Sequence, residues 1–169
     1  MKKMIDLFKN YLLEADMSHY ELGGKITLYH YARSEEEEIF LDTARFGESS
    51  FSKREKETSR GPRVFFYVDL AQRERYISSG RSLYKVEVDA KDIYNLKEDP
   101  NGYVELVRHP MYGLRKQIEW DDLLNKIKEN YLGVYYSVPN MDVVAWFENI
   151  SIPKVSEEER SVLEKSGVV

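Results

Sequence analysis

The sequence predicts a single α+β domain, and three observations indicate this class. The chain has 169 residues, the size of one ordinary domain, and 42% of them are apolar, enough to form a hydrophobic core. An early helical pattern, several short strand-like runs, a later helical pattern and a closing hairpin follow one another, an order typical of α+β proteins. Neither an internal repeat nor a Pro/Gly/Ser-rich linker divides the chain. We therefore expect one α+β domain over residues 1–155, followed by a charged C-terminal helix or tail over residues 156–169.

Hydrophobic patterning predicts one helix and three strands in the first half of the chain. The predicted elements are a helix over residues 4–15 and strands over residues 26–31, 64–70 and 83–89. The 64–70 strand (Val-Phe-Phe-Tyr-Val-Asp-Leu) is apolar almost throughout, so we expect it at a central position with both faces covered. The acidic run 33–38 is expected to be a solvated segment, and the polar residues 42–63 to form a long loop.

The second half of the chain predicts a turn, a helix, a hairpin and a terminal helix. The expected elements are a turn at 99–102, a helix from Trp120 to Tyr131, strands over 134–138 and 143–147 around a turn at 139–142, and a helix over 156–167. Asp-Pro-Asn-Gly at 99–102 has the composition of a turn. Ser156 and Glu159 form the capping-box pattern that begins a helix.

The composition excludes several kinds of protein and site. Without cysteine there is no disulfide framework, zinc-thiolate site or cysteine nucleophile, and the three histidines form no recognisable metal set, so we predict no metal. The net charge of −5 argues against broad nucleic-acid binding, although residues 53–63 form a local basic segment. No apolar stretch approaches the roughly 18 residues of a membrane span, and Asp6 interrupts the start of the chain where a signal-peptide core would follow. We expect a cytoplasmic protein with no membrane partner.

Four segments that are far apart in the chain carry its most distinctive side chains. They are Leu28-Tyr29-His30-Tyr31, the 64–70 strand with Phe66 and Tyr67, Tyr76 a few residues later, and the hairpin from Gly133 to Phe147. In this order and spacing, over roughly residues 25–152, they resemble the histidine-type branch of the ADP-ribosyltransferase family, which binds NAD. The resemblance implies split mixed or antiparallel β-sheets with flanking helices.

For the NAD-binding strands, the resemblance implies that His30 anchors a ribose and that the neighbouring Tyr31 also contacts NAD. Tyr67 and Tyr76 would sandwich the nicotinamide, since the face of an aromatic ring attracts a cationic one. Phe66 is the alternative for the position of Tyr67, because successive residues of a strand point to opposite sides. Between these two residues, we predict Tyr67.

A catalytic acid and a phosphate contact complete the implied site. The family usually has Glu in or just before the hairpin, but Gly133, Val134 and Tyr135 offer no acid there, so Asp142 is the nearest substitute. Asp142 would stabilise the positive charge that develops on the ribose as nicotinamide leaves. Arg63 would contact the pyrophosphate, because a guanidinium suits bidentate phosphate binding.

The resemblance therefore implies an NAD-dependent mono-ADP-ribosyltransferase with His30, Tyr67 and Asp142 as its catalytic residues. Such a glycosyltransferase cleaves the nicotinamide–ribose bond of NAD and transfers ADP-ribose to a macromolecular acceptor, here expected to be protein rather than nucleic acid. It would be an effector, a toxin or a phage-type modifying enzyme. Two alternatives stay open: a non-catalytic interaction protein or inhibitor on the same fold, and an NAD-using enzyme that resembles RNA 2'-phosphotransferases.

Each candidate residue also has an ordinary structural interpretation. Taken alone, a histidine among β-forming residues such as His30 is more often structural, and Phe66 and Tyr67 are more often strand core. Asp142 alone is typical of a turn. The catalytic assignment requires His30 and Asp142 to face the same side of the sheet, and it fails if they lie on opposite sides.

Overall fold

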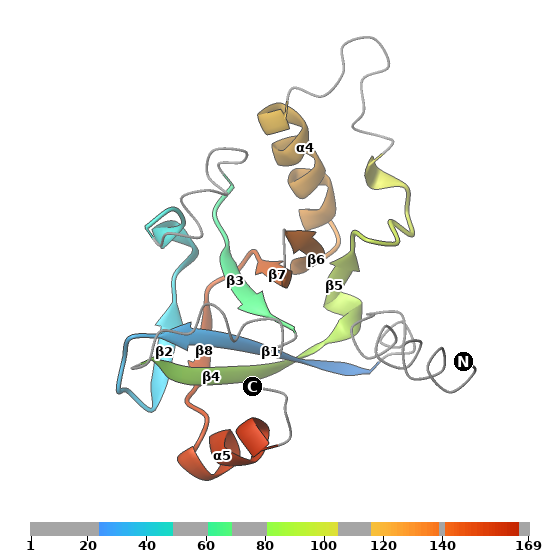
Figure 1. Cartoon of the computed structure of the whole chain (residues 1–169). Helices are drawn as coiled ribbons and strands as arrows, with labels where there is room; N and C mark the ends of the chain where they lie inside the picture. The colour runs from blue at the N-terminus through green and yellow to red at the C-terminus, as the bar shows by residue number, and fades with distance from the viewer. Residues whose placement is uncertain (1–23, 49–60, 69–80, 105–115, 139–140, 166–169) are drawn as a thin grey trace, which may run out of the picture.

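The computed structural model describes residues 24–48, 61–68, 81–104, 116–138 and 141–165 (Figure 1). The strands are β1 (Lys25–Ala32), β2 (Glu38–Leu41), β3 (Val64–Tyr67), β4 (Ser82–Asp89), β5 (Ile93–Asn95), β6 (Gly133–Val138), β7 (Met141–Trp146) and β8 (Ile150–Pro153). The helices are α4 (Lys116–Lys128) and α5 (Glu157–Lys165), with short 3-10 turns η2 (Thr43–Arg45) and η4 (Ala90–Asp92). This content confirms the predicted α+β class. In the described part of the chain, neither helix has the length and apolar composition to cross a membrane.

Six strands form one sheet in the order β4-β1-β3-β7-β6-β5, and β2 and β8 form a separate two-stranded sheet. Neighbouring strands of the large sheet are antiparallel, except that β5 runs parallel to β6. The apolar strand β3 lies between β1 and β7, which confirms its predicted central position. Strands β6 and β7 form the predicted hairpin.

The large sheet bends where β1 meets β3. Strand β1 pairs with β4 along its whole length, from Lys25↔Asp89 to Ala32↔Ser82. Among the described residues, β1 pairs with β3 only at Tyr29↔Tyr67. Figure 1 shows the consequence: β3 leaves β1 at a steep angle, so the sheet consists of a β4–β1 arm and a β3–β7–β6–β5 arm.

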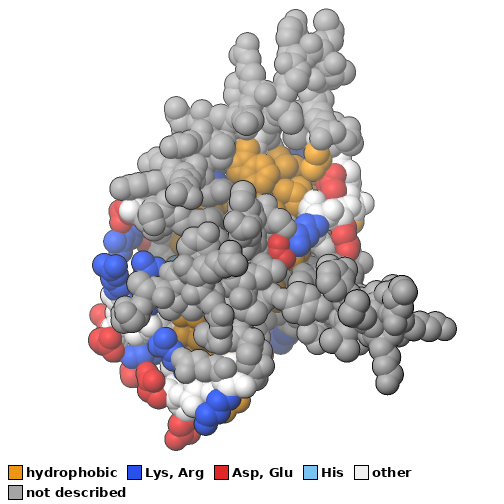
Figure 2. Space-filling model, in the orientation of Figure 1, with side chains coloured by type: hydrophobic (Ala, Val, Ile, Leu, Met, Phe, Trp, Pro, Cys, Tyr) orange, Lys and Arg blue, Asp and Glu red, His pale blue; other side chains and the backbone are white. Residues whose placement is uncertain are grey.

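Both helices pack on the same face of this sheet, which we call the helix face. Helix α4 packs Leu123, Leu124 and Ile127 against the second arm. Beneath the first arm, Val155 and Leu163 near and within α5 pack with Tyr31. The two helices lie at opposite ends of the molecule in Figure 1, although they pack on the same face of the sheet. The helix face is therefore the outer side of the bend. Figure 2 shows hydrophobic side chains gathered in the part of the view where α4 lies.

The opposite face, on the inner side of the bend, is covered in part by the small sheet, and we call it the inner face. Ile39 of β2 and Ile152 of β8 are Cα partners, and both belong to a cluster with Leu28 and Phe66 of the large sheet. Strand β8 also meets β4 through the isolated bridge Tyr84↔Lys154. The small sheet therefore closes the inner face beside the β4–β1 arm.

Two local predictions of turn and cap chemistry are confirmed. The Asp-Pro-Asn-Gly turn closes through a hydrogen bond from Gly102 N to Asp99 O (2.9 Å), and Asp99 itself has a positive φ of 47°. Helix α5 begins after Ser156, whose Oγ accepts a hydrogen bond from Glu159 N (3.1 Å). In both cases a short polar side chain satisfies backbone donors at the start of a new element.

Other predictions need correction or cannot be compared. The prediction that Asp142 belongs to the hairpin turn is wrong: Ser137↔Asp142 and Val138↔Met141 are Cα pairs, so Asp142 lies inside β7 and only residues 139–140 separate the strands. The acidic run 33–38 is largely exposed, as expected, but its last residue begins β2. The predicted 4–15 helix and Tyr76 lie outside the described residues.

Candidate functional site

The strand register decides which predicted site residues lie together. Residues that are Cα partners across two strands point to the same side, and residues two apart on one strand also do. Because Tyr29 pairs with Tyr67, the adjacent residues His30 and Phe66 both point to the inner face. Phe66 pairs with Val144, so Asp142, two residues from Val144, also points there. His30, Phe66 and Asp142 therefore share the inner face.

The same register separates the other predicted residues from them. Tyr67 points to the helix face, so the prediction that Tyr67 rather than Phe66 joins His30 on one side of the sheet is wrong. The physical reason is the period of two, which turns every second residue away. Tyr31, the Cα partner of Leu83, also lies on the helix face, where it is buried near α5.

His30 links the two arms of the sheet at the bend. Its Nδ1 lies 2.9 Å from the carbonyl oxygen of Phe65, and because a carbonyl only accepts, the proton is on Nδ1. The imidazole thus donates a hydrogen bond at the position where the β1–β3 ladder has ended. The His30 ring meets the edge of Phe66, with ring centroids 5.9 Å apart and planes at 66°. These contacts fix both the tautomer and the orientation of the half-buried ring.

Phe66 is part of the hydrophobic core beneath His30. Its side chain is fully buried, at 0% exposure, and belongs to a cluster with Leu28, Tyr135 and Val144. A ring that stacks on a ligand needs an open face, and a fully buried ring offers none without rearrangement. In this structure Phe66 therefore supports the His30 ring, and the predicted nicotinamide contact is not prepared there.

Asp142 is the one buried carboxylate among the described residues, with 8% of its surface exposed. Its Oδ2 accepts a hydrogen bond from Tyr135 Oη (2.9 Å) and one from Lys97 Nζ (2.9 Å), which also forms an ion pair with it. The Lys97 ammonium lies 4.9 Å from the centroid of the Tyr135 ring. These three side chains form a compact polar cluster on the inner face.

Sequence reasoning missed the two donors to Asp142. Tyr135 lies on β6 beside β7 and two residues from Ser137, the Cα partner of Asp142. A hairpin prediction with the correct two-residue loop could have placed Tyr135 on the same side as Asp142. Lys97 is 45 residues away from Asp142 in the chain and follows the three-residue strand β5, so no local pattern signals it.

Arg63 lies with aromatic and cationic side chains on the helix face. It is 1% exposed, its guanidinium carbon lies 4.2 Å from the Phe46 ring centroid and 5.5 Å from that of Phe65, and Nη1 donates to Gly61 O (2.9 Å). Burial, and next the charge of Arg63, lower the pKa of Lys128. The structure therefore places Arg63 beside a second cation, on the face opposite His30 and Asp142.

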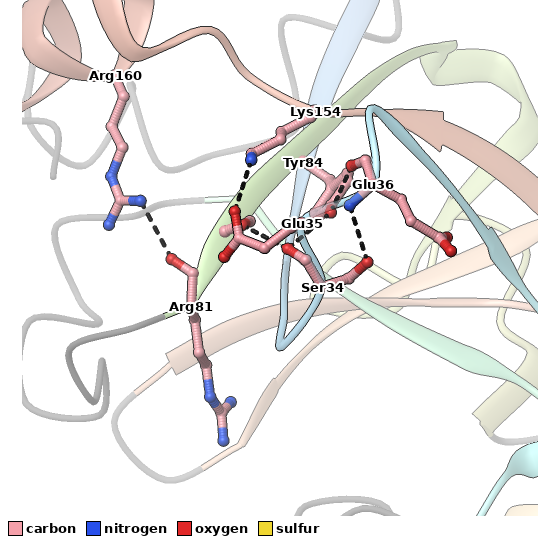
Figure 3. A network of polar contacts seen from close by, with 8 residues as sticks. Ser34, Glu35, Glu36, Arg81, Tyr84, Lys154 and Arg160 are labelled. Carbon is pink, nitrogen blue, oxygen red and sulfur yellow. Dashed lines mark hydrogen bonds and ion pairs between the residues drawn. The ribbon is translucent and has the colours of Figure 1, made fainter.

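A polar network holds the strand that carries His30 (Figure 3). Tyr84, the Cα partner of His30, donates its hydroxyl hydrogen to the Glu36 carbonyl oxygen (2.9 Å), with the Ser34 carbonyl also within 3.2 Å. Lys154 Nζ forms an ion pair with Glu35 (3.2 Å), and this hydrogen bond raises the pKa of Lys154. The network ties the chain after β1 to β4 and to the end of β8, and so fixes the β4–β1 arm.

No family model matches the chain, and neither a curated protein nor a solved structure matches it. Within the described residues, no group of three or more His, Cys, Asp or Glu side chains is arranged to hold a metal ion.

Proposed function

We propose that the protein is an NAD-dependent mono-ADP-ribosyltransferase of the split-sheet fold, with its site on the inner face. The observation that supports this most is the common orientation of His30 and Asp142, which lie on different arms of the bent sheet. Two polar groups that are 112 positions apart in the sequence thus point to the same side. A site built across the bend can hold the two halves of a dinucleotide.

The proposed chemistry assigns one task to each group. Nicotinamide leaves NAD as a neutral molecule, so the difficult part of the reaction is the positive charge that develops on the ribose. The Asp142 carboxylate would stabilise that charge, an effect on the order of 3 kcal/mol for a preorganised group. His30 Nδ1 donates to the Phe65 carbonyl oxygen, so Nε2 would accept a hydrogen bond from a ribose hydroxyl. Tyr76 would be the aromatic partner of nicotinamide. Tyr67 would not, because it points to the helix face.

We propose a macromolecular acceptor, with protein favoured over nucleic acid. The net charge of −5 supports this choice, because a nucleic-acid acceptor with many phosphates favours a positive surface. An enzyme of this size and kind would act as an effector, toxin or phage-type modifying enzyme in the cytoplasm.

The direct test is the release of nicotinamide from NAD by the full chain. We expect Asp142→Asn to lower the release rate about 100-fold or more. For His30, the variant His30→Asn keeps an amide donor for the Phe65 carbonyl but has no group at the position of Nε2. We therefore expect this variant to fold and to lose activity.

The matched control is Asp89→Asn, which should keep full activity. The Asp89 carboxylate pairs with Lys25 at the surface (3.6 Å). Equal release by wild type and Asp142→Asn would reject the assignment.

A second function is favoured by one observation. The carboxylate of Asp142 is already paired with Lys97, which offsets its charge. A carboxylate paired in this way suits a non-catalytic interaction protein on the same fold. This reading predicts that wild type releases no nicotinamide at millimolar NAD. It also predicts that Asp142→Asn leaves the biological effect intact.

A further inference from the structure

The side-chain amide of Asn95 has an unused donor in the interior. Asn95 is 6% exposed, and its Oδ1 accepts a hydrogen bond from Lys97 N (3.1 Å). That bond fixes the amide orientation, because the flipped amide would place two donors against each other. Within the described part of the chain, Nδ2 has no hydrogen-bond partner. A buried donor without a partner costs free energy, so its retention requires a reason.

Asn95 belongs to the polar cluster around Asp142. It ends β5 and is the Cα partner of Tyr135 on β6, so both side chains point to the inner face. Tyr135 in turn donates to Asp142 on β7. Lys97 contacts both ends of this row, through its backbone N at Asn95 and through Nζ at Asp142. Three adjacent strands thus present an amide, a phenol and a carboxylate side by side.

The charge of this cluster indicates the kind of group it can bind. The charges of Asp142 and Lys97 offset each other, and the side chains of Asn95 and Tyr135 are neutral. An anionic group gains little from a neutral site, whereas the Nδ2 hydrogens of Asn95 need an acceptor. An uncharged oxygen, either a sugar hydroxyl or a carboxamide carbonyl, meets this need.

Lys97 is the part of the cluster that can move to admit such a group. Its side chain is 37% exposed, against 10% for Asp142. A long, partly exposed side chain can turn toward water and leave its ion pair, while the buried Asp142 carboxylate keeps its hydrogen bond from Tyr135. Its movement would uncover the row that it now bridges.

We propose that Asn95 is a ligand-binding residue of the Asp142 site, whose Nδ2 donates to an uncharged oxygen of the ligand once Lys97 moves aside. The inference rests on the proposed function, because the probes that test it are the two products of NAD cleavage. ADP-ribose supplies the sugar hydroxyls, and nicotinamide supplies the carboxamide carbonyl.

The test is a nuclear magnetic resonance titration of the ¹⁵N-labelled full chain. The Asn95 side-chain amide peaks are assigned by their loss in Asn95→Asp, which keeps the acceptor for Lys97 N. ADP-ribose and nicotinamide are added separately. We expect the Asn95 peaks to shift with one of them, which identifies the source of the oxygen. The Asn101 side-chain amide, which donates to the Tyr131 hydroxyl (3.1 Å), serves as the unshifted reference.

A binding measurement with variants accompanies the titration. We expect Asn95→Ala and Asn95→Asp to lower the affinity for the probe that shifts the peaks by at least about tenfold. We expect Asn101→Ala to bind that probe as wild type does. Thermal melting confirms that each variant is folded. The proposal is overturned if neither probe shifts the Asn95 peaks at up to millimolar concentration, as expected if a trapped water occupies the donor. Failure of the proposed function looks different: a probe then shifts the Asn95 peaks while wild type releases no nicotinamide.

Discussion

At the scale of single residues, Asp142 is defined by the two donors that hold it. Tyr135 and Lys97 both reach Oδ2 at 2.9 Å, and a buried carboxylate without such partners is strongly destabilising. The same contacts limit what Asp142 can do, because the Lys97 charge offsets the negative charge that a ribosyl cation needs. Lys97 therefore has two opposite effects: it stabilises the folded protein, and it weakens the proposed action of Asp142 on the ribose.

Replacing Lys97 separates its effect on catalysis from its effect on stability. We expect Lys97→Met to raise the rate of nicotinamide release up to about tenfold, equivalent to about 1.4 kcal/mol, because no cation then offsets the negative charge of the carboxylate. We also expect the free energy of unfolding to fall by about 1–2 kcal/mol, because Asp142 loses a donor. Single-turnover kinetics and urea unfolding measure the two effects. Lys126→Met, which removes an exposed pair with Glu129, is the control. A slower release in Lys97→Met would show that the ion pair positions the acid.

Tyr94 predicts a pH dependence of stability. Burial, and next the hydrogen bond to Asp99, raise the pKa of Tyr94 far above its usual range. The folded protein thus keeps the phenol proton while the unfolded chain releases it above about pH 10. This contribution is complete below pH 10 and falls as the pH rises further, by up to about 1.4 kcal/mol per pH unit. In urea unfolding, Tyr94→Phe should cost about 1 kcal/mol at pH 7 and show a shallower decline above pH 10. An unchanged decline would contradict the assignment.

Residue-level predictions succeeded where the cause is local. The Asp99 turn and the Ser156 cap follow from backbone donors within five positions of the side chain. The choice of Tyr67 over Phe66 was wrong because it depends on one pairing, Tyr29↔Tyr67, between strands that are far apart in sequence. No composition or spacing within a strand fixes which of its two sides faces a distant partner.

At the scale of elements, strands within long apolar or alternating runs of sequence were predictable, and β2, β5 and β8 were not. Strands β1 and β4 have eight residues each and a clear preference for β structure. Strands β2, β5 and β8 have three or four residues, too few for a period of two to be recognised. Pairing with partners elsewhere in the chain, such as β2 with β8, decides their conformation.

The start of β6 gives a prediction about packing. A Cβ at Gly133 would lie 3.0 Å from Trp146 Cε3 and 3.1 Å from the Ala145 carbonyl oxygen, so Gly133→Ala requires these neighbours in β7 to shift by a few tenths of an ångström. We expect it to lower the free energy of unfolding by about 1–3 kcal/mol. Gly102→Ala is the comparison: its Cβ has open space, and only its φ of +64° opposes the change, at about 1 kcal/mol. If chemical unfolding shows Gly133→Ala to be the milder change, the close packing of β6 on β7 is not what the structure indicates.

At the scale of the whole molecule, the bend of the sheet relates fold to site. The helix face on the outside is covered by α4 and α5, and the inner face carries His30, Asp142 and Asn95. Helix α5, expected as a charged C-terminal helix or tail, is joined to this body through an ion pair between Lys85 and Glu159. The bend itself was not predicted, because it arises where the ladder between β1 and β3 ends, and no pattern within either strand marks that point.

The proposed function requires one NAD molecule to bind on the inner face and to contact residues of both arms. A crystal structure of the full chain soaked with NAD tests this most directly. We expect nucleotide density, whole or after loss of nicotinamide, on the inner face, with a ribose hydroxyl within hydrogen-bond distance of His30 Nε2 and the ribose beside Asp142. Density on the helix face near Tyr67 and Arg63, or none at millimolar NAD, would contradict it.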